Sequence, residues 1–202
     1  QKGFPILKAT ADFWLSRVEK ENDGTYHIRN VVAADEWAEN VDDNAYTNGV
    51  AKLNLMAASE AAKLLGETVV PAWNKVAEGL VILSFPDGVT REHAQYEGAN
   101  IKQADVNLLA YPLRLITDPA QIEKDLAYYE TRVPEKNTPA MTQAIFSLLY
   151  SRLGNVDKAT HFFKDAYLPN LNPPFRVIAE TKGGVNPYFI TGAGGVLQAV
   201  MM

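Results

Sequence analysis

The sequence predicts a mainly α-helical protein, because apolar residues recur with helical spacing along most of the chain of 202 residues. Few segments have the alternating or continuous apolar pattern of strands. Segments rich in proline, glycine and asparagine fall between the helical ones, as is typical of loops. The composition, 47% hydrophobic and 21% charged, is that of a folded globular chain and not of a disordered one.

Six helices are expected from apolar faces, over residues 4–18, 46–64, 70–80, 118–129, 138–153 and 156–166. Several of their ends carry capping signals. Gly66 supplies the stop of the second helix, and Pro71 stands in the first turn of the third. Asp118 is the expected N-cap of the fourth helix, and Gly154 followed by Asn155 ends the fifth and caps the sixth.

The remaining local signals are weaker. Strand-like runs are confined to residues 26–32 and 81–85, and the helical faces expected to be buried include Leu64 and Val156. The chain stops within the apolar stretch 196–202, whereas natural termini are usually polar. We therefore expect one segment, residues 1–202, of a longer protein, and its start assigns no compartment. Every apolar run is far shorter than the ~18 residues of a membrane span.

Charge and residue types exclude several functions. The chain has 24 acidic and 19 basic residues, a net charge of −5, and lacks a basic cluster. A nucleic-acid partner or an anionic membrane surface is therefore not expected. Cysteine is absent, which excludes disulfides and thiolate metal sites, and the three histidines lack metal-ligand spacing. No metal or organic cofactor is implied.

The glycine-rich segment 191–195, with the sequence T-G-A-G-G, has two interpretations. It could bind phosphate, but it lacks the lysine of a P-loop and no clear strand precedes it. The favoured interpretation is the start of a helix that packs closely on its neighbours.

Three acids have unusual neighbours. Asp35 and Glu36 precede Trp37 after an apolar run, and Glu180 ends a second apolar run before two glycines. Acids flanked by apolar residues are candidates for partial burial, which raises a carboxyl pKa and suits a general acid. On this pattern alone, a helix cap or an ion-pair partner is the commoner explanation for each.

Several motifs together resemble glycoside hydrolase family 65. The sequence has D-E-W at 35–37 and V-D-D-N-A-Y-T-N at 41–48, and then K-Q-A-D-V at 102–106. T-P-A-M-T at 138–142 and F-I-T-G-A-G-G at 189–195 follow in the family's order. Each motif is weak by itself, but the set is specific and covers nearly the whole chain.

The resemblance implies an (α/α)6 toroid, of which this chain would form about half, and an α-glucoside substrate. It implies that Glu36 is the general acid, which protonates the glycosidic oxygen. Lys102 and Gln103 would hold hydroxyls of the released glucose, and Asp35 and Trp37 would also belong to the substrate site. Tryptophan stands there in place of the family's usual tyrosine or phenylalanine.

The family contains phosphorylases and a hydrolase branch, which includes protein-glucosylgalactosylhydroxylysine glucosidases and acid trehalases. Residues 137–141 lack the serine pair with which phosphorylases bind phosphate, and Glu180 stands where the hydrolases carry a second carboxylate. The resemblance therefore implies inverting hydrolysis, with Glu36 as acid and Glu180 as base. An inverting pair should lie roughly 6.5–9.5 Å apart.

Part of the family's pattern is missing. A complete toroid needs on the order of 350 residues, and the upstream F-W-D-T-E-like motif, whose aspartate contacts glucose, is absent. We expect weak or no activity from this chain alone, and exposed faces that favour self-association or require a missing N-terminal half. A phosphate-dependent phosphorylase, or a non-catalytic helical scaffold or sugar-binding remnant, remains the alternative. A disaccharide and a glycosylated hydroxylysine are both open as substrates.

Overall fold

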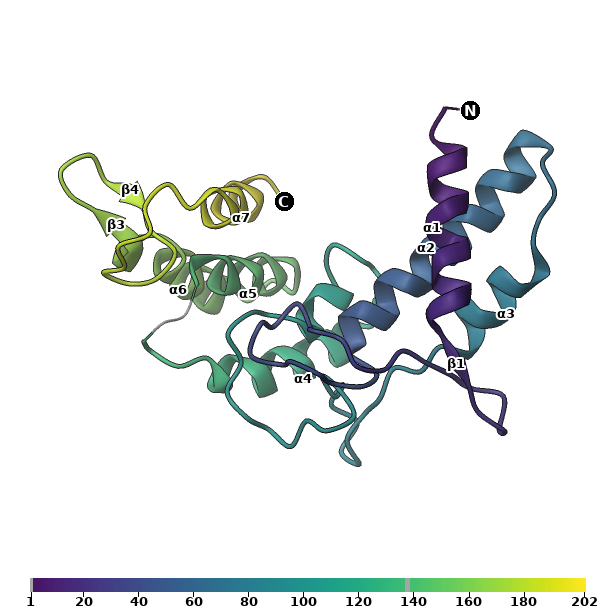
Figure 1. Ribbon diagram of the computed structural model, residues 1–202. Coiled ribbons are helices and arrows are strands. Elements are labelled where there is room, and N and C mark those ends of the chain that lie inside the picture. The colour runs from purple at the N-terminus through teal and green to yellow at the C-terminus, as the bar shows by residue number, and fades with distance from the viewer. Residues whose placement is uncertain (1, 137–138) are drawn as a thin grey trace. The chain divides into compact units, whose positions relative to one another are not determined.

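A computed structural model describes residues 2–136 and 139–202, and in these ranges helices predominate (Figure 1). The α-helices are α1 (Phe4–Arg17), α2 (Ala45–Leu65), α3 (Pro71–Gly79), α4 (Pro119–Tyr129), α5 (Ala140–Arg152), α6 (Val156–Asp165) and α7 (Ile190–Met201). Short 3-10 helices are η1 (Val106–Leu109), η2 (Glu130–Arg132) and η3 (Leu168–Asn170). Two antiparallel pairs are formed by strands β1 (Glu19–Lys20) with β2 (Tyr26–His27) and β3 (Leu171–Asn172) with β4 (Val177–Ile178). No helix among the described residues is long and apolar enough to cross a membrane.

The prediction of a mainly helical protein is confirmed, and α1 to α6 lie where the six helices were expected. The capping signals explain this agreement. Gly66 ends α2 in the left-handed conformation with φ of 69°, which glycine adopts without strain. The side chains of Asp118 and Asn155 accept hydrogen bonds from backbone amides at the starts of α4 and α6.

Other local expectations are wrong. In the described ranges residues 81–85 form no strand, and β2 covers only the start of 26–32 because the later residues make isolated bridges such as Val31 with Val41. Leu64 and Val156, expected on buried faces, are 85% and 70% exposed. Both lie in terminal turns of their helices. The expected start of the fifth helix at residue 138 lies outside the described residues, and α5 begins at Ala140.

Contacts divide the chain into two compact units. Unit 1 comprises Gln1–Ala33 and Ala38–Tyr96, and its helices α1, α2 and α3 pack on one another (Figure 1). The small residues Ala51 and Ala58 on α2 are fully buried and let the neighbouring helices approach closely. The fully buried Trp73 of α3 fills this core, and its ring nitrogen donates a hydrogen bond to Asp12 of α1 at 3.1 Å.

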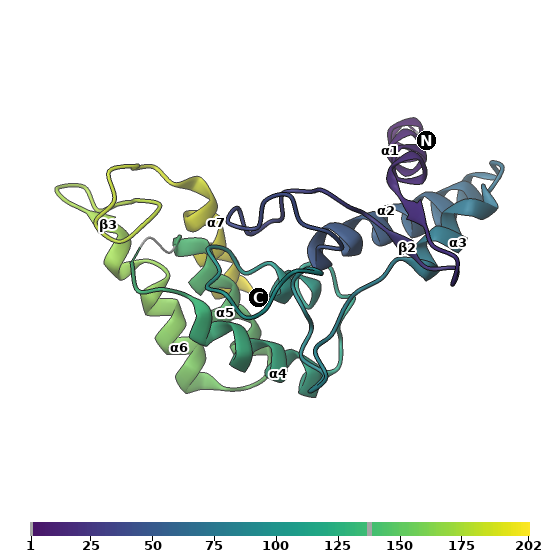
Figure 2. The same cartoon turned by 60° about the horizontal axis from the view of Figure 1, so that its bottom comes forward.

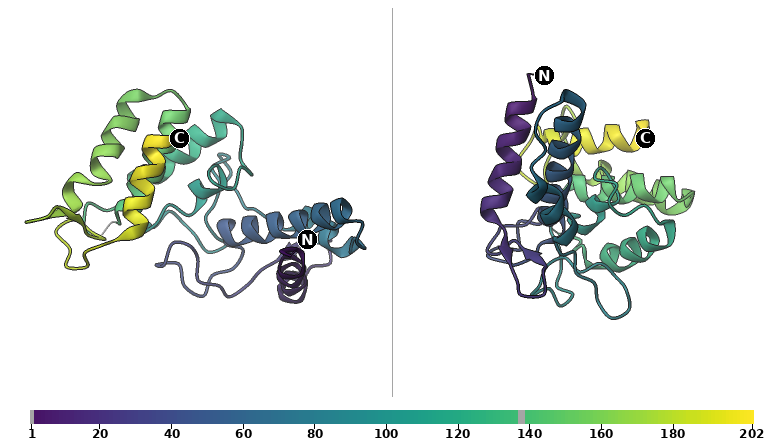
Figure 3. Two further views of the ribbon diagram at one scale, coloured as in Figure 1. Left: turned by 90° about the horizontal axis from the view of Figure 1, so that it is seen from above. Right: turned by 90° about the vertical axis from the view of Figure 1, so that its right-hand side faces the viewer.

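Unit 2 comprises Ala34–Trp37 and Glu97–Met202. Its helix α5 packs on α6, with α4 next to α5 (Figure 2), and α7 packs on another face of α5 (Figure 3). A Cβ atom on Gly195 of α7 would lie 2.9 Å from Cβ of Ala144 on α5, and one on Gly192 would lie 3.0 Å from Cβ of Ala140. The glycines therefore permit close helix packing, which confirms the favoured interpretation of segment 191–195.

Candidate active site

Two buried aspartates hold residues 34–37 in place within unit 2. Oδ2 of Asp105 accepts hydrogen bonds from the amides of Ala34 and Asp35, at 3.0 and 3.4 Å. Oδ1 of Asp35 accepts from the amides of Trp37 and Lys102, at 3.1 and 3.0 Å. The two aspartates are 1% and 2% exposed. They satisfy amides that no helix or strand satisfies, and so fix the backbone on both sides of Glu36.

The Glu36 side chain projects from this segment toward two polar partners. Nζ of Lys102 and Nε2 of Gln103 both lie 2.6 Å from Oε2 of Glu36. In return Oε1 of Gln103 accepts a hydrogen bond from the Glu36 amide at 3.0 Å. The Lys102 ammonium, followed by the Gln103 amide, lowers the pKa of Glu36 because both stabilise the charged carboxylate. Both contacts therefore favour the ionised form of Glu36.

The same lysine reaches the second carboxylate. Nζ of Lys102 lies 3.5 Å from Oε1 of Glu180, and its pKa is raised, chiefly by Glu36 and also by Glu180. Nζ of Lys102 lies 2.6 Å from an oxygen of Glu36 and 3.5 Å from an oxygen of Glu180. These two oxygens are therefore at most about 6 Å apart. One cation therefore holds two carboxylates that are 144 positions apart in the sequence. The expected gap of roughly 6.5–9.5 Å concerns carboxyl groups with a water between them, and it stays a prediction.

Glu180 is held through its main chain as well. Its carbonyl oxygen accepts hydrogen bonds from the amide of Ala140, the first residue of α5, and from Nδ2 of Asn170, each at 3.0 Å. Nδ2 of Asn170 also donates to the carbonyl of Ala179 at 3.1 Å. Asn170 is 3% exposed, so this anchor is shielded from water. The side-chain oxygen Oε2 of Glu180 accepts from Nδ2 of Asn186 at 3.0 Å.

The structure thus brings Glu36, Lys102, Gln103 and Glu180 together. Trp37 is half exposed and adjacent in sequence to Glu36. The expectation that burial raises the pKa of an acid in this segment holds for Asp35, whose carboxyl is desolvated. The expectation is wrong for Glu36, because its apolar sequence neighbours do not cover its side chain, which is 60% exposed.

Sequence reasoning missed four supporting residues, Asp105, Thr142, Asn170 and Asn186. Asp105 belongs to the K-Q-A-D-V motif, and this motif could have assigned it a role. Thr142 donates from its hydroxyl to the Lys102 carbonyl at 2.9 Å, and Asn186 binds Glu180. Thr142 belongs to the T-P-A-M-T motif, which could have assigned it a role, whereas no spacing predicts the contacts of Asn170 and Asn186. Asp35 was expected to contact substrate. Its carboxylate accepts hydrogen bonds from the backbone amides of Trp37 and Lys102, and its contact with substrate stays a prediction.

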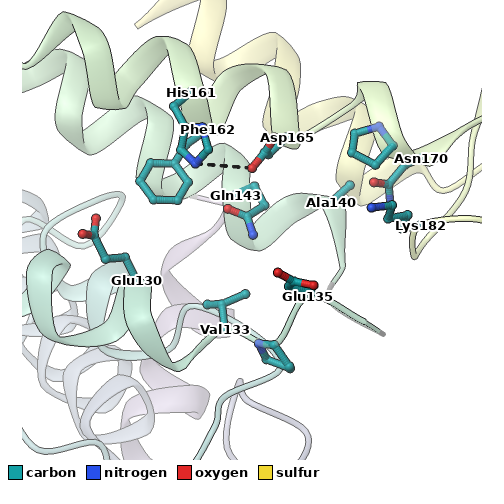
Figure 4. Close-up of a pocket in the computed structure, with 12 residues that line it drawn as sticks. Glu130, Val133, Glu135, Ala140, Gln143, His161, Phe162, Asp165, Asn170 and Lys182 are labelled. Carbon is teal, nitrogen blue, oxygen red and sulfur yellow. Dashed lines mark ion pairs between the residues drawn. The ribbon is translucent and has the colours of Figure 1, made fainter.

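Unit 2 has two cavities whose lining includes residues that support the cluster, and neither cavity is lined by Glu36, Lys102 or Glu180. One of about 500 Å³ is lined by Ala34, Gln103 and Thr142 together with residues of α5 and α7. The other, of about 440 Å³, is lined by Ala140 and Asn170, the two residues that hold the Glu180 carbonyl, and by polar residues of α6 (Figure 4). Among the described residues no group of three or more histidines and acids has a geometry that could hold a metal ion.

Two carboxylates thus lie near one another on a largely helical framework, and glycosidases use pairs of carboxylates to cleave glycosidic bonds. Comparison with known families agrees with this class. The model of the glycosyl hydrolase family 65 central catalytic domain matches residues 1–100 and 89–180. The chain belongs to this family, which confirms the family that the sequence motifs indicate.

Individual relatives show how much of a family member the chain represents. It is 66% identical over 202 residues to a kojibiose hydrolase of Mucilaginibacter mallensis, covering 100% of this chain and 30% of the relative. It is 37% identical over 208 residues to a protein-glucosylgalactosylhydroxylysine glucosidase of Danio rerio, covering 99% and 31%. The chain therefore spans less than a third of the length of these relatives.

A solved structure is similar in fold. A putative kojibiose phosphorylase from the human microbiome matches 82% of this chain and 29% of its own, with a TM-score of 0.69 and 19% identity. At this identity the likeness shows the fold alone.

Proposed function

We propose that this chain carries the catalytic carboxylates of an inverting α-glucoside hydrolase, as part of an (α/α)6 toroid. Glu36 acts as general acid and Glu180 as general base. The observation that carries the proposal is the shared lysine. Nζ of Lys102 lies 2.6 Å from Glu36 and 3.5 Å from Glu180, so both acids face one small volume.

The reaction uses each carboxylate once per turnover. Glu36 donates a proton to the glycosidic oxygen as the bond from that oxygen to the anomeric carbon breaks. Glu180 accepts a proton from a water whose oxygen bonds to the anomeric carbon from the opposite face. The products are an alcohol and glucose of inverted configuration. Exchange with solvent then returns a proton to Glu36 and removes one from Glu180.

A general acid must be protonated when it acts, yet Lys102 and Gln103 lower the pKa of Glu36 and favour its ionised form. Its two partners resolve this conflict, because Lys102 and Gln103 donate to a carboxylate oxygen that a sugar hydroxyl can replace. When glucose takes these donors, Glu36 loses the groups that lower its pKa, and the sugar excludes water from the carboxyl. Substrate binding therefore favours the protonated acid.

The second carboxylate also favours a hydrolase over a phosphorylase. A phosphate dianion near Glu180 would meet a like charge, whereas a neutral water can donate a hydrogen bond to the carboxylate. The relative from Mucilaginibacter mallensis is named a kojibiose hydrolase, so kojibiose is the first substrate to test, with trehalose and a glucosyl-galactosyl unit beside it. The half-exposed Trp37 offers an aromatic face for the sugar.

The test is glucose release from these three glucosides with and without phosphate. It compares the unsubstituted chain with Glu36→Gln and Glu180→Gln, and Glu39→Gln serves as a control at an exposed acid. The chain spans 30% of the Mucilaginibacter mallensis relative. A chimera of that relative, in which this chain replaces the matching segment, is therefore assayed as well.

In the relative that carries this segment, we expect phosphate-independent release that both site variants abolish and the control retains, with β-glucose as the first anomer seen by NMR; the chain alone should release little or none. Formation of glucose 1-phosphate would instead indicate a phosphorylase. Full activity in Glu36→Gln and Glu180→Gln would contradict the assigned acid and base, and glucoside binding without turnover would favour the sugar-binding remnant.

A further inference from the structure

We infer that Asn186 is a positioning residue for Glu180, which fixes the rotation of the carboxylate so that Oε1 faces the reacting water. This inference deepens the proposed function, since it depends on Glu180 acting as the base. Nothing in the sequence motifs assigns Asn186 a role. Its side chain lies on the loop between β4 and α7, six positions after Glu180.

Asn186 contacts Glu180 through both its side chain and its main chain. Nδ2 of Asn186 donates to Oε2 of Glu180 at 3.0 Å, and the Glu180 amide donates to the Asn186 carbonyl at 3.1 Å. The loop between them is closed separately by the Gly184 amide, which donates to the Thr181 carbonyl at 2.9 Å. The loop therefore brings Asn186 back to Glu180, and the side-chain contact is additional to the main-chain turn.

The two oxygens of Glu180 consequently have different partners. Oε2 accepts from the neutral amide of Asn186, while Oε1 lies 3.5 Å from the ammonium of Lys102. When a sugar hydroxyl engages Lys102, Oε1 loses its cation and becomes the oxygen that can accept a proton from water. Asn186 stays on Oε2 and prevents the carboxylate from turning away.

This contact restricts the freedom that the backbone anchors leave. Ala140 and Asn170 hold the Glu180 carbonyl, but neither contacts its carboxylate in the described hydrogen bonds. The side-chain torsions of glutamate would otherwise let the carboxylate rotate in a site where the side chain is 27% exposed. A misplacement of about 1 Å at a catalytic group can reduce turnover about 100-fold.

The experiment compares Asn186→Asp and Asn186→Ala with Asn172→Ala. Aspartate keeps the shape of asparagine but cannot donate at that position when ionised. Asn172→Ala is the matched control, because Nδ2 of Asn172 donates to the Gly184 carbonyl at 2.8 Å and supports the same loop without contacting Glu180. Turnover and KM are measured for kojibiose in the relative that carries this segment and in the chain itself.

We expect kcat to fall about 10- to 100-fold in both Asn186 variants with KM changed less than about 2-fold, because the base and not the glucose pocket is disturbed. Asn172→Ala should retain kcat within about 3-fold. An unchanged kcat in Asn186→Ala, or an equal loss in Asn172→Ala, would overturn the positioning role.

A second readout needs no turnover. The side-chain amide signal of Asn186 in ¹⁵N NMR spectra should differ between the unsubstituted protein and Glu180→Gln. The reason is that a neutral amide replaces the carboxylate that accepts the Asn186 hydrogen bond. An unmoved signal would overturn the contact. If Glu180→Gln itself retains full turnover, the proposed base is wrong while the NMR result still decides the contact with Asn186.

Discussion

Replacing Asp35 with alanine should destabilise unit 2 more than any exposed capping residue does. Oδ1 of Asp35 accepts two backbone amides in a site where the residue is 2% exposed. Alanine would leave the amides of Trp37 and Lys102 without this acceptor, at about 1–3 kcal/mol each. Removal of a desolvated charge offsets part of this cost. We expect a net loss of about 2–4 kcal/mol in the free energy of unfolding.

Asp35→Asn separates the hydrogen bonds from the charge. Its carbonyl oxygen can still accept both amides, so we expect a loss below about 1 kcal/mol at neutral pH. Because burial raises the pKa of Asp35, the folded protein holds the proton more strongly than the unfolded chain does. The contribution of Asp35 to the stability of the wild type is therefore present below its pKa in the unfolded chain. It is lost as the pH rises through its higher pKa in the folded protein. Over that window, Asp35→Asn should gain stability relative to wild type.

Urea unfolding followed by circular dichroism at several pH values measures both effects. Asp118→Ala is the control within the same unit, because Asp118 accepts one amide in an exposed position. The control should lose about 1 kcal/mol. If Asp35→Ala loses no more free energy of unfolding than this control, Asp35 does not hold residues 34–37 in place. If the stability difference between Asp35→Asn and wild type does not vary with pH, the charge of Asp35 does not have the proposed effect.

Three further substitutions test other parts of the structure. Lys102→Met should raise the pKa of Glu36, since its strongest charged partner is lost, and should move the basic limb of kcat/KM to higher pH; an unmoved limb would contradict Glu36 as the acid. Gly195→Ala should lower the thermal stability by about 1–3 kcal/mol, because its Cβ would lie 2.9 Å from that of Ala144; an unchanged melting temperature would refute the close packing. Asn155→Ala should cost about 1 kcal/mol in urea unfolding through loss of the α6 cap, and no change would show that water replaces the cap.

Local chemistry explains which parts of the fold could be predicted from sequence. Gly66, Asp118 and Asn155 act on backbone groups within a few residues of themselves, so their signals are present in the sequence. Leu64 and Val156 fit the same helical periodicity, yet both are exposed. Periodicity identifies the apolar face of a helix, but how much of that face is buried depends on how far the neighbouring helices extend along it.

The candidate site shows a similar limit. The family resemblance indicated Glu36, Lys102, Gln103 and Glu180, but the residues adjacent to Glu36 in the sequence could not predict the environment of its side chain. Its exposure depends on how Asp105, about 70 positions away, holds the segment. The contact of Asn186 with Glu180 likewise depends on a loop conformation that no residue spacing specifies. Sequence therefore indicated the proposed reacting groups, whereas their ionisation and orientation depend on tertiary contacts.

If Glu36 and Glu180 are the acid and base as proposed, the sharing of one ammonium between two carboxylates predicts a site that is selective for the charge of an inhibitor. Two carboxylates and one ammonium together carry a formal net charge of −1. A sugar analogue with a protonated ring nitrogen could occupy the place of the Lys102 ammonium and contact both acids, whereas an anionic analogue would be repelled. Basic sugar analogues should therefore bind more tightly than neutral ones, and added salt should reduce that advantage.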